Sequence, residues 1–284
     1  MTTELKHNYR VDRGDFLGLD LSYYDTGNEG HPIVFVHGNS GSSEVFVHQF
    51  DDLDITEHYR CIAVDLPGHG SSGKFNNPGD YNIKNLSLVI AEFINSFSFP
   101  SVLLAGHSLG GHIVLEAAPN VENLGGAVCW GTTPIKLPTE FDKMFIPDEA
   151  INVMFSEEYT EGMLDAVMNS FSLKGEAAKV VKSCFKQTDP KVRSSLAANI
   201  QNTNTYCDEV QLIENATYPI GILFGSEEKA LSRDYIESLS LKGIWREKIQ
   251  FVPKLGHYCQ MENAKIFNGM LLEFFDDCLK ILSL

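Results

Sequence analysis

The chain has 284 residues, of which 43% are apolar. This length suits one large domain, or a domain with an insertion, and the apolar fraction excludes a disordered chain. The formal net charge of −16 repels phosphate groups, so we expect no nucleic-acid partner and no docking on an anionic membrane. The polar start of the chain lacks the apolar core of a secretion signal, and the six cysteines form no C-x-x-C pair. We therefore expect a cytoplasmic protein, and the sequence leaves its oligomeric state open.

In chain order, the first half alternates predicted strands and helices. Apolar–polar alternation predicts exposed edge strands at 9–12 and 16–24. Continuous apolar runs predict strands covered on both faces at 32–36, 59–64, 101–105 and 126–130. Helical spacing predicts a short helix at 44–50 and longer ones at 82–97 and 111–118.

The pattern changes after residue 134. Between 135 and 215 there is no run of the buried-strand type, and helices are predicted at 148–155, 157–171, 175–186 and 190–203. Strands return at 219–224 and 248–252, with helices at 232–241 and 263–284. The prediction is an α/β fold whose mostly parallel sheet, with helices on both faces, comes from 1–134 and 216–284, with a helical cap at 135–215.

One stretch combines a buried strand, a tight turn and a helix. Gly106, Ser108 and Gly110 follow the strand at 101–105 in the pattern G-x-S-x-G. Glycine is needed on both sides of such a turn because side chains there would collide with neighbouring backbone. Strand, G-x-S-x-G and helix together indicate a nucleophile elbow, with Ser108 as the candidate nucleophile.

A serine nucleophile needs a base, and the base needs an orienting acid, in the chain order Ser, acid, His. His257 is the candidate base, because it follows the last predicted strand, whereas His112 lies within the helix behind the elbow. Glu228 is the candidate acid in the loop after the penultimate strand, and the adjacent Glu227 remains an alternative.

An oxyanion hole needs two backbone N–H donors. We predict the N–H of Leu109, which follows the nucleophile, and that of Asn39 in the loop after the first buried strand, where Gly38 lets substrate approach. Asp65 and His69 resemble a second acid–base pair, but we assign them a structural role in their turn. No metal-ligand spacing and no dinucleotide fingerprint is present, so no metal and no cofactor is expected.

Four separated motifs carry a family resemblance. HGNSGSS at 37–43, DLPGHGSS at 65–72, GHSLGG at 106–111 and GH at 256–257 strongly resemble the α/β-hydrolase superfamily from about residue 16 to 280. This resemblance implies the α/β-hydrolase fold. A serine at position 108 sets the chain apart from the dehalogenase and epoxide-hydrolase branches, which carry aspartate there.

A narrower resemblance is to the α/β-hydrolase-type N-acyl-homoserine lactonases. It rests on HGNSGSS followed by Phe46 and Gln49, SLGGHI, WGTTP, FSEEYTE in the insertion and GSEE. It implies a metal-independent Ser–His–Glu triad that opens acylated lactones. The family's lactone-contacting tyrosine aligns with Met163 here, and Tyr159, one helical turn away on the same predicted face, is its possible substitute.

Gly38, Trp130 and Tyr258 complete the predicted substrate contacts. The insertion is also rich in flexible or flat apolar side chains, which suit either an acyl pocket or the core of the cap: Phe141, Met144, Phe145, Met154, Phe155, Met163, Met168 and Phe171. We predict a serine hydrolase of a small ester or lactone with an apolar acyl group, first of all N-acyl-homoserine lactone. The alternatives are a short-chain carboxylesterase and a low-turnover ligand-binding receptor.

Overall fold

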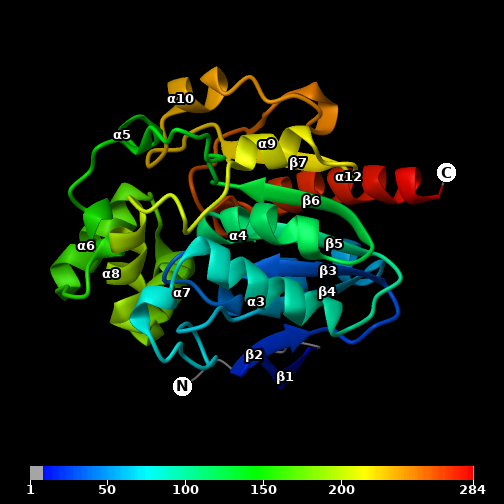
Figure 1. Ribbon diagram of the computed structural model, residues 1–284, viewed down its shortest axis with the longest axis horizontal. Coiled ribbons are helices and arrows are strands. Elements are labelled where there is room, and N and C mark those ends of the chain that lie inside the picture. The colour runs from blue at the N-terminus through cyan, green and yellow to red at the C-terminus, as the bar shows by residue number, and fades with distance from the viewer. Residues whose placement is uncertain (1–8, 284) are drawn as a thin grey trace.

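Eight strands form one sheet in the computed structural model, which describes residues 9–283 (Figure 1). The strand order is β1-β2-β4-β3-β5-β6-β7-β8, antiparallel from β1 through β2 to β4 and parallel from β4 onward. The strands are β1 (Arg10–Phe16), β2 (Leu19–Asp25), β3 (His31–Val36), β4 (Tyr59–Val64), β5 (Val102–His107), β6 (Leu124–Trp130), β7 (Ile220–Gly225) and β8 (Gln250–Val252). The predicted fold class is confirmed.

Helices cover both faces of this sheet. In Figure 1, α3 (Ile83–Asn95) and α4 (Leu109–Ala117) lie in front of it, and α12 (Ala264–Leu282) runs behind it. The other α-helices are α1 (Val47–Phe50), α2 (Leu53–Thr56), α5 (Phe141–Met144), α6 (Glu161–Ser170), α7 (Gly175–Gln187), α8 (Pro190–Asn199), α9 (Glu209–Glu214), α10 (Arg233–Ser238) and α11 (Cys259–Glu262). Short 3-10 turns are η1 (Ser43–Phe46), η2 (Pro78–Asp80), η3 (Ala118–Asn120), η4 (Ile151–Phe155) and η5 (Trp245–Glu247).

The core follows from the apolar runs of the sequence. Every residue of β5 and β7 is buried, as expected of parallel strands covered by helices on both faces. Helix α3 turns its apolar side, including Leu86, Ile90 and Phe93, onto the sheet. Within residues 9–283, no helix is both long enough and apolar enough to cross a bilayer.

The helices between β6 and β7 gather mainly at one edge of the sheet. The arrows of β3 and β6 point toward α6, α7 and α8 in Figure 1, so these helices lie beyond the carboxyl ends of the strands. Helix α9 instead packs on α4, in the layer that covers the sheet. The side chains that emerge at the carboxyl edge therefore face a helical cover, and the division of the chain into domains stays a prediction.

Several boundaries differ from the predictions for local reasons. The predicted strand at 16–24 is interrupted by a turn at Leu17 and Gly18, which both have positive φ. The helix predicted at 157–171 begins only at Glu161, because the Thr160 side chain caps it by accepting from Met163 N–H. Tyr159 thus precedes the helix, and the prediction that it shares a helical face with Met163 is wrong.

Candidate active site

The elbow at the end of β5 holds Ser108 in a backbone conformation that few residues adopt. Its φ is 53° and its ψ is −120°. A Cβ on Gly106 would lie 2.4 Å from the Gly110 carbonyl oxygen, and one on Gly110 would lie 2.1 Å from the Val36 carbonyl oxygen. Both distances are far inside van der Waals contact, so the two glycines permit the turn.

Hydrogen bonds from the next strand fix this turn. Ser108 N–H donates to the Trp130 carbonyl at 2.9 Å, and the Thr132 hydroxyl donates to the Ser108 carbonyl at 2.8 Å. Helix α4 begins at Leu109, one residue after the serine. The free N–H groups and the dipole of its first turn therefore favour negative charge beside the Ser108 side chain.

His257 and Glu228 meet at the same edge from different loops. His257 follows β8, Glu228 follows β7, and His257 Nδ1 donates to Glu228 Oε2 at 2.7 Å. Both side chains are almost fully buried, at 8% and 6% exposed. Because Glu228 holds Nδ1, Nε2 is the ring nitrogen left for a proton transfer.

Two opposing influences act on the Glu228 carboxyl. Burial tends to raise the pKa of Glu228. The charge of His257, the hydrogen bond from His257 to Glu228, and the backbone N–H groups of Ala230 and Lys229 together outweigh burial and lower that pKa. Glu228 is consequently an anion able to stabilise an imidazolium at His257. The competing Glu227 has an exposed side chain, so the structure brings Glu228 and not Glu227 to the histidine.

Aromatic neighbours hold the His257 ring in place. Phe171 directly follows α6 in the helical segment, which is the part of the chain between β6 and β7. It stacks on the imidazole, with ring centroids 5.1 Å apart and an interplanar angle of 19°. The buried His107, inside the G-x-S-x-G pattern, donates from Nε2 to the His257 carbonyl at 3.0 Å. Sequence reasoning missed both roles, because neither contact is encoded by a local spacing.

Asn39 and Leu109 line the same cavity as Ser108 and His257. Within residues 9–283, neither of their backbone N–H groups donates a hydrogen bond. The Asn39 side chain points elsewhere, because its Nδ2 donates to the Met154 carbonyl in η4 at 2.6 Å. Two unused N–H groups near a serine hydroxyl are what an oxyanion hole requires.

Two side chains of the DLPGHGSS motif, Asp65 and His69, accept hydrogen bonds from the loop that carries Asn39. His69 Nε2 accepts from Ser40 N–H at 3.2 Å, and Asp65 Oδ1 accepts from both N–H and hydroxyl of Ser43 at 2.8 Å. Burial lowers the pKa of His69 well below its usual value, so this ring is neutral and able to accept. Asp65 and His69 thus contact the loop backbone and do not line the cavity.

A cavity of about 130 Å³ opens over Ser108 and His257. Gly38 and Tyr258, two of the predicted substrate contacts, line it. Much of its wall is apolar and comes from the helical segment, with Phe141, Met144, Phe145, Met154, Phe155 and Phe171 among the lining residues. The volume is below the roughly 300–1,000 Å³ of typical ligand pockets, so the space suits a small ligand.

Three other predicted substrate contacts do not reach this cavity. Trp130 is fully buried in the core, where its indole N–H donates to Gln260 Oε1 at 2.8 Å. Tyr159 packs edge-on against Phe185, and Met163 is 42% exposed on the outer side of α6. The resemblance placed Tyr159 and Met163 by sequence position, but Tyr159 lies before α6 and packs on Phe185, and Met163 faces solvent.

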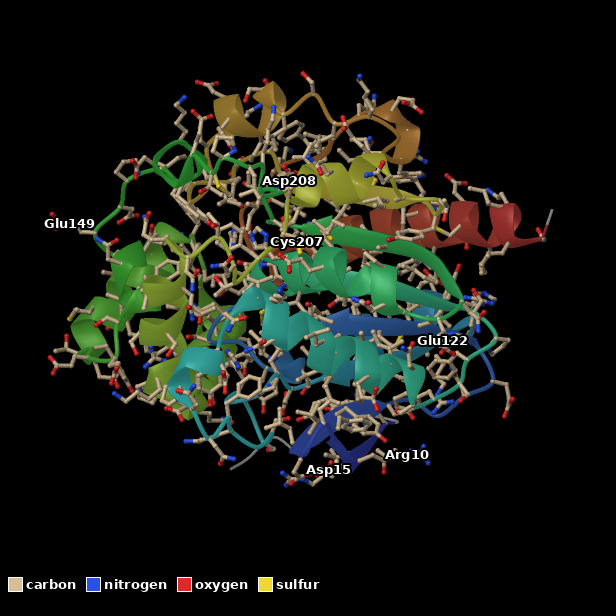
Figure 2. All side chains as sticks on the ribbon, in the orientation of Figure 1. Arg10, Asp15, Glu122, Glu149, Cys207 and Asp208 are labelled. Carbon is tan, nitrogen blue, oxygen red and sulfur yellow. The ribbon has the colours of Figure 1, made fainter. Side chains whose placement is uncertain are left out.

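Behind the elbow, three ionisable side chains connect α4 to α9. His112 donates from Nδ1 to both carboxylate oxygens of the fully buried Glu209 at 2.9 Å, and Glu116 accepts from Cys207 N–H at 2.6 Å. Figure 2 shows Cys207 at the point where the chain enters α9. Burial and the nearby Glu209 raise the pKa of Glu116 to about 7.

No group of three or more His, Cys, Asp or Glu side chains suited to a metal ion occurs within residues 9–283.

Comparisons with known proteins agree with the architecture. A model of the alpha/beta hydrolase family matches residues 33–268. The chain is 24% identical over 264 residues to a 2-hydroxy-6-oxononadienedioate/2-hydroxy-6-oxononatrienedioate hydrolase of Cupriavidus pinatubonensis, covering 88% of each chain. Its structure is similar to that of the N-acyl homoserine lactonase AidH with N-hexanoyl homoserine, with a TM-score of 0.87, 22% identity and coverage of 95% of this chain and 97% of that one. It is also similar to esterase RhEst1 from Rhodococcus sp. ECU1013, with a TM-score of 0.76, 21% identity and coverage of 95% and 98%.

The raised pKa of Glu116 predicts a pH-dependent stability. Between about pH 4.5 and 7 the unfolded chain has released the Glu116 proton while the folded chain retains it, so the contribution of this group to the free energy of unfolding falls as pH rises. Glu116→Gln removes this dependence. We therefore expect the difference in free energy of unfolding, Glu116→Gln minus unmodified protein, to increase from pH 5 to pH 8 when both are measured by urea denaturation.

The exposed Glu122, far from Cys207 in Figure 2, supplies the matched control. Glu122→Gln should leave the difference from the unmodified protein constant over the same pH range. Parallel stability curves for Glu116→Gln and the unmodified protein would contradict the raised pKa.

Proposed function

The chain belongs to the alpha/beta hydrolase family, and from this premise we propose that it is a metal-independent serine hydrolase that opens a lactone or ester with an apolar acyl group. The observation that carries the proposal is the buried 2.7 Å contact between His257 Nδ1 and Glu228, beside a cavity that Ser108 also lines. Such an arrangement supports the roles of nucleophile, base and orienting acid for Ser108, His257 and Glu228.

The proposed reaction begins at Ser108. Its Oγ attacks the substrate carbonyl carbon while His257 Nε2 takes the hydroxyl proton, and Glu228 stabilises the imidazolium. The carbonyl oxygen becomes an oxyanion that accepts from the N–H groups of Asn39 and Leu109, each such donor contributing roughly 3–4 kcal/mol.

Collapse of this intermediate breaks the bond to the alkoxy oxygen, which receives the proton from His257. In a lactone that oxygen stays in the same molecule, so the ring opens and an acyl-enzyme remains on Ser108. Water, deprotonated by His257, then attacks the acyl carbon and releases the hydroxy acid. The enclosing apolar walls limit other water near the acyl-enzyme.

N-acyl-homoserine lactone is the substrate that we favour within this class. The motifs shared with the lactonases and the similarity to AidH, a protein solved with N-hexanoyl homoserine, support this choice. The apolar wall provided by Met144, Phe145 and Phe155 suits an acyl chain. The cavity volume of about 130 Å³ favours short acyl chains over long ones.

Substitutions in the triad should lower activity without unfolding the protein. Ser108→Ala should reduce kcat by about 10⁴-fold or more, and Glu228→Gln by about 10²- to 10⁴-fold, because the first removes the nucleophile and the second the charge that stabilises His257. Steady-state kinetics on a p-nitrophenyl ester, together with melting temperatures, measure both effects.

Glu227→Gln is the matched control for the acid, since Glu227 is adjacent and exposed. It should retain the activity of the unmodified protein. Equal losses in the two glutamate variants, or full activity in Ser108→Ala, would contradict the assignment.

A substrate panel tests the chemical class. Incubation with N-acyl-homoserine lactones of graded chain length should yield products heavier by one water, detected by mass spectrometry, with the highest kcat/KM for short acyl chains. The Ser108→Ala protein should produce none of them.

The same panel separates the alternatives. Hydrolysis of p-nitrophenyl esters with no lactone opened would identify a carboxylesterase. Tight retention of a lactone with no turnover of any substrate would identify a receptor and overturn the proposed function.

A further inference from the structure

The cavity contains a second polar centre apart from the reacting groups. His112 lies on α4, four residues after Ser108, and lines the cavity with its side chain 17% exposed. Its Nδ1 is held by Glu209, whose Oε2 also accepts from Ile135 N–H at 2.8 Å. The ring is thereby fixed, and Nε2 makes no hydrogen bond within residues 9–283.

The Glu209 carboxylate beside Nδ1 favours the charged form of His112. Burial tends to lower the pKa of His112, but the Glu209 carboxylate outweighs burial and raises that pKa. In the imidazolium form both ring nitrogens carry hydrogen, so Nε2 can donate and cannot accept. The proposed reaction does not use this donor.

Thr133 provides an independent observation in the wall of the same cavity. Thr133 lines the same cavity and is only 1% exposed, yet its hydroxyl has no partner within the described residues. Its loop connects the start of α4 to α9, because the Thr132 hydroxyl donates to the Ser108 carbonyl and Ile135 N–H donates to Glu209. Buried hydroxyls are normally paired, so an unpaired one on a residue that lines a cavity is a candidate hydrogen-bonding group for a ligand.

Other polar side chains around the cavity are already engaged within the protein. The Asn82 side chain caps α3 by accepting from Asn85 N–H and donates to the Gly79 carbonyl. The hydroxyl of Tyr206 donates to the Ile200 carbonyl. His112 and Thr133 are therefore the pair available to a ligand on this side of the cavity.

We propose that His112 Nε2 and the Thr133 hydroxyl form a subsite for a second carbonyl oxygen of the substrate, distinct from the carbonyl that Ser108 attacks. This deepens the proposed function and rests on it for the position of the substrate. It makes the enzyme selective for molecules with an additional ketone or amide carbonyl over plain alkyl esters and lactones. An acylated homoserine lactone carries such a carbonyl in its amide.

A neutral carbonyl fits this subsite better than a carboxylate. The charge of the His112 imidazolium is balanced by Glu209, whose carboxylate lies 2.9 Å from His112 Nδ1. A ligand anion would gain little from a neutralised cation and would be repelled by this carboxylate. A carbonyl needs only the two hydrogen bonds.

Binding to the Ser108→Ala protein tests the subsite independently of turnover. Calorimetry compares N-hexanoyl homoserine lactone with a γ-lactone carrying a hydrocarbon chain of equal length, and methyl 5-oxohexanoate with methyl hexanoate. The carbonyl-bearing member should bind more tightly in at least one pair. Adding Thr133→Val, or the double change His112→Gln and Glu209→Gln, should reduce that preference about tenfold or more, because a polar site rejects ligands that leave it unpaired.

Two comparisons exclude a merely structural effect. Thr133→Val should not lower the melting temperature, because the lost hydroxyl makes no hydrogen bond in the described part of the chain. Thr188→Val, at a buried threonine that is not among the cavity residues, should leave the preference unchanged. Equal binding within both pairs, or a preference that survives both sets of changes, overturns the subsite. Absence of lactone turnover in the unmodified protein counts against the proposed function alone.

Discussion

The hydrogen bond between the buried His257 and Glu228 is the constraint on which the rest of the site depends. The two residues are 29 positions apart in sequence and meet only because β7 and β8 are parallel neighbours whose carboxyl ends share one edge. Ser108 leaves β5 at that same edge, on a turn that requires Gly106 and Gly110. Parallel pairing thus brings together, from distant segments, an imidazole and a carboxylate, and His257 Nε2 makes no hydrogen bond within residues 9–283.

The helical segment contributes to this centre as well as covering it. Phe171 stacks on the His257 ring, and the Met154 carbonyl holds the Asn39 side chain. Fully buried Arg193 of α8 adds a third connection, donating to the Ser156 carbonyl and lying 3.5 Å from the Ser40 hydroxyl. The position of the loop that carries Asn39 therefore depends on the packing of this segment, and so does the proposed oxyanion hole.

Local chemistry could be predicted from the sequence, whereas long-range partners could not. Continuous apolar runs predicted the parallel strands, and G-x-S-x-G predicted the turn at Ser108, because each depends on neighbouring residues. Trp130, Tyr159 and Met163 were misplaced as substrate contacts because side-chain direction depends on packing between distant segments. Glu209 was missed for the same reason: it lies 97 residues beyond His112, and its meeting with that histidine requires α9 to pack on α4.

The most direct test of the central claim is the site and rate of covalent labelling by a fluorophosphonate, followed by peptide mapping. Such a reagent reacts with a serine activated by a neighbouring base. The account predicts one adduct per chain, on Ser108, formed much more slowly when Glu228 is changed to Gln than when Glu227 is. An adduct on another residue, or labelling of Ser108 at the same rate without the Glu228 carboxylate, would contradict it.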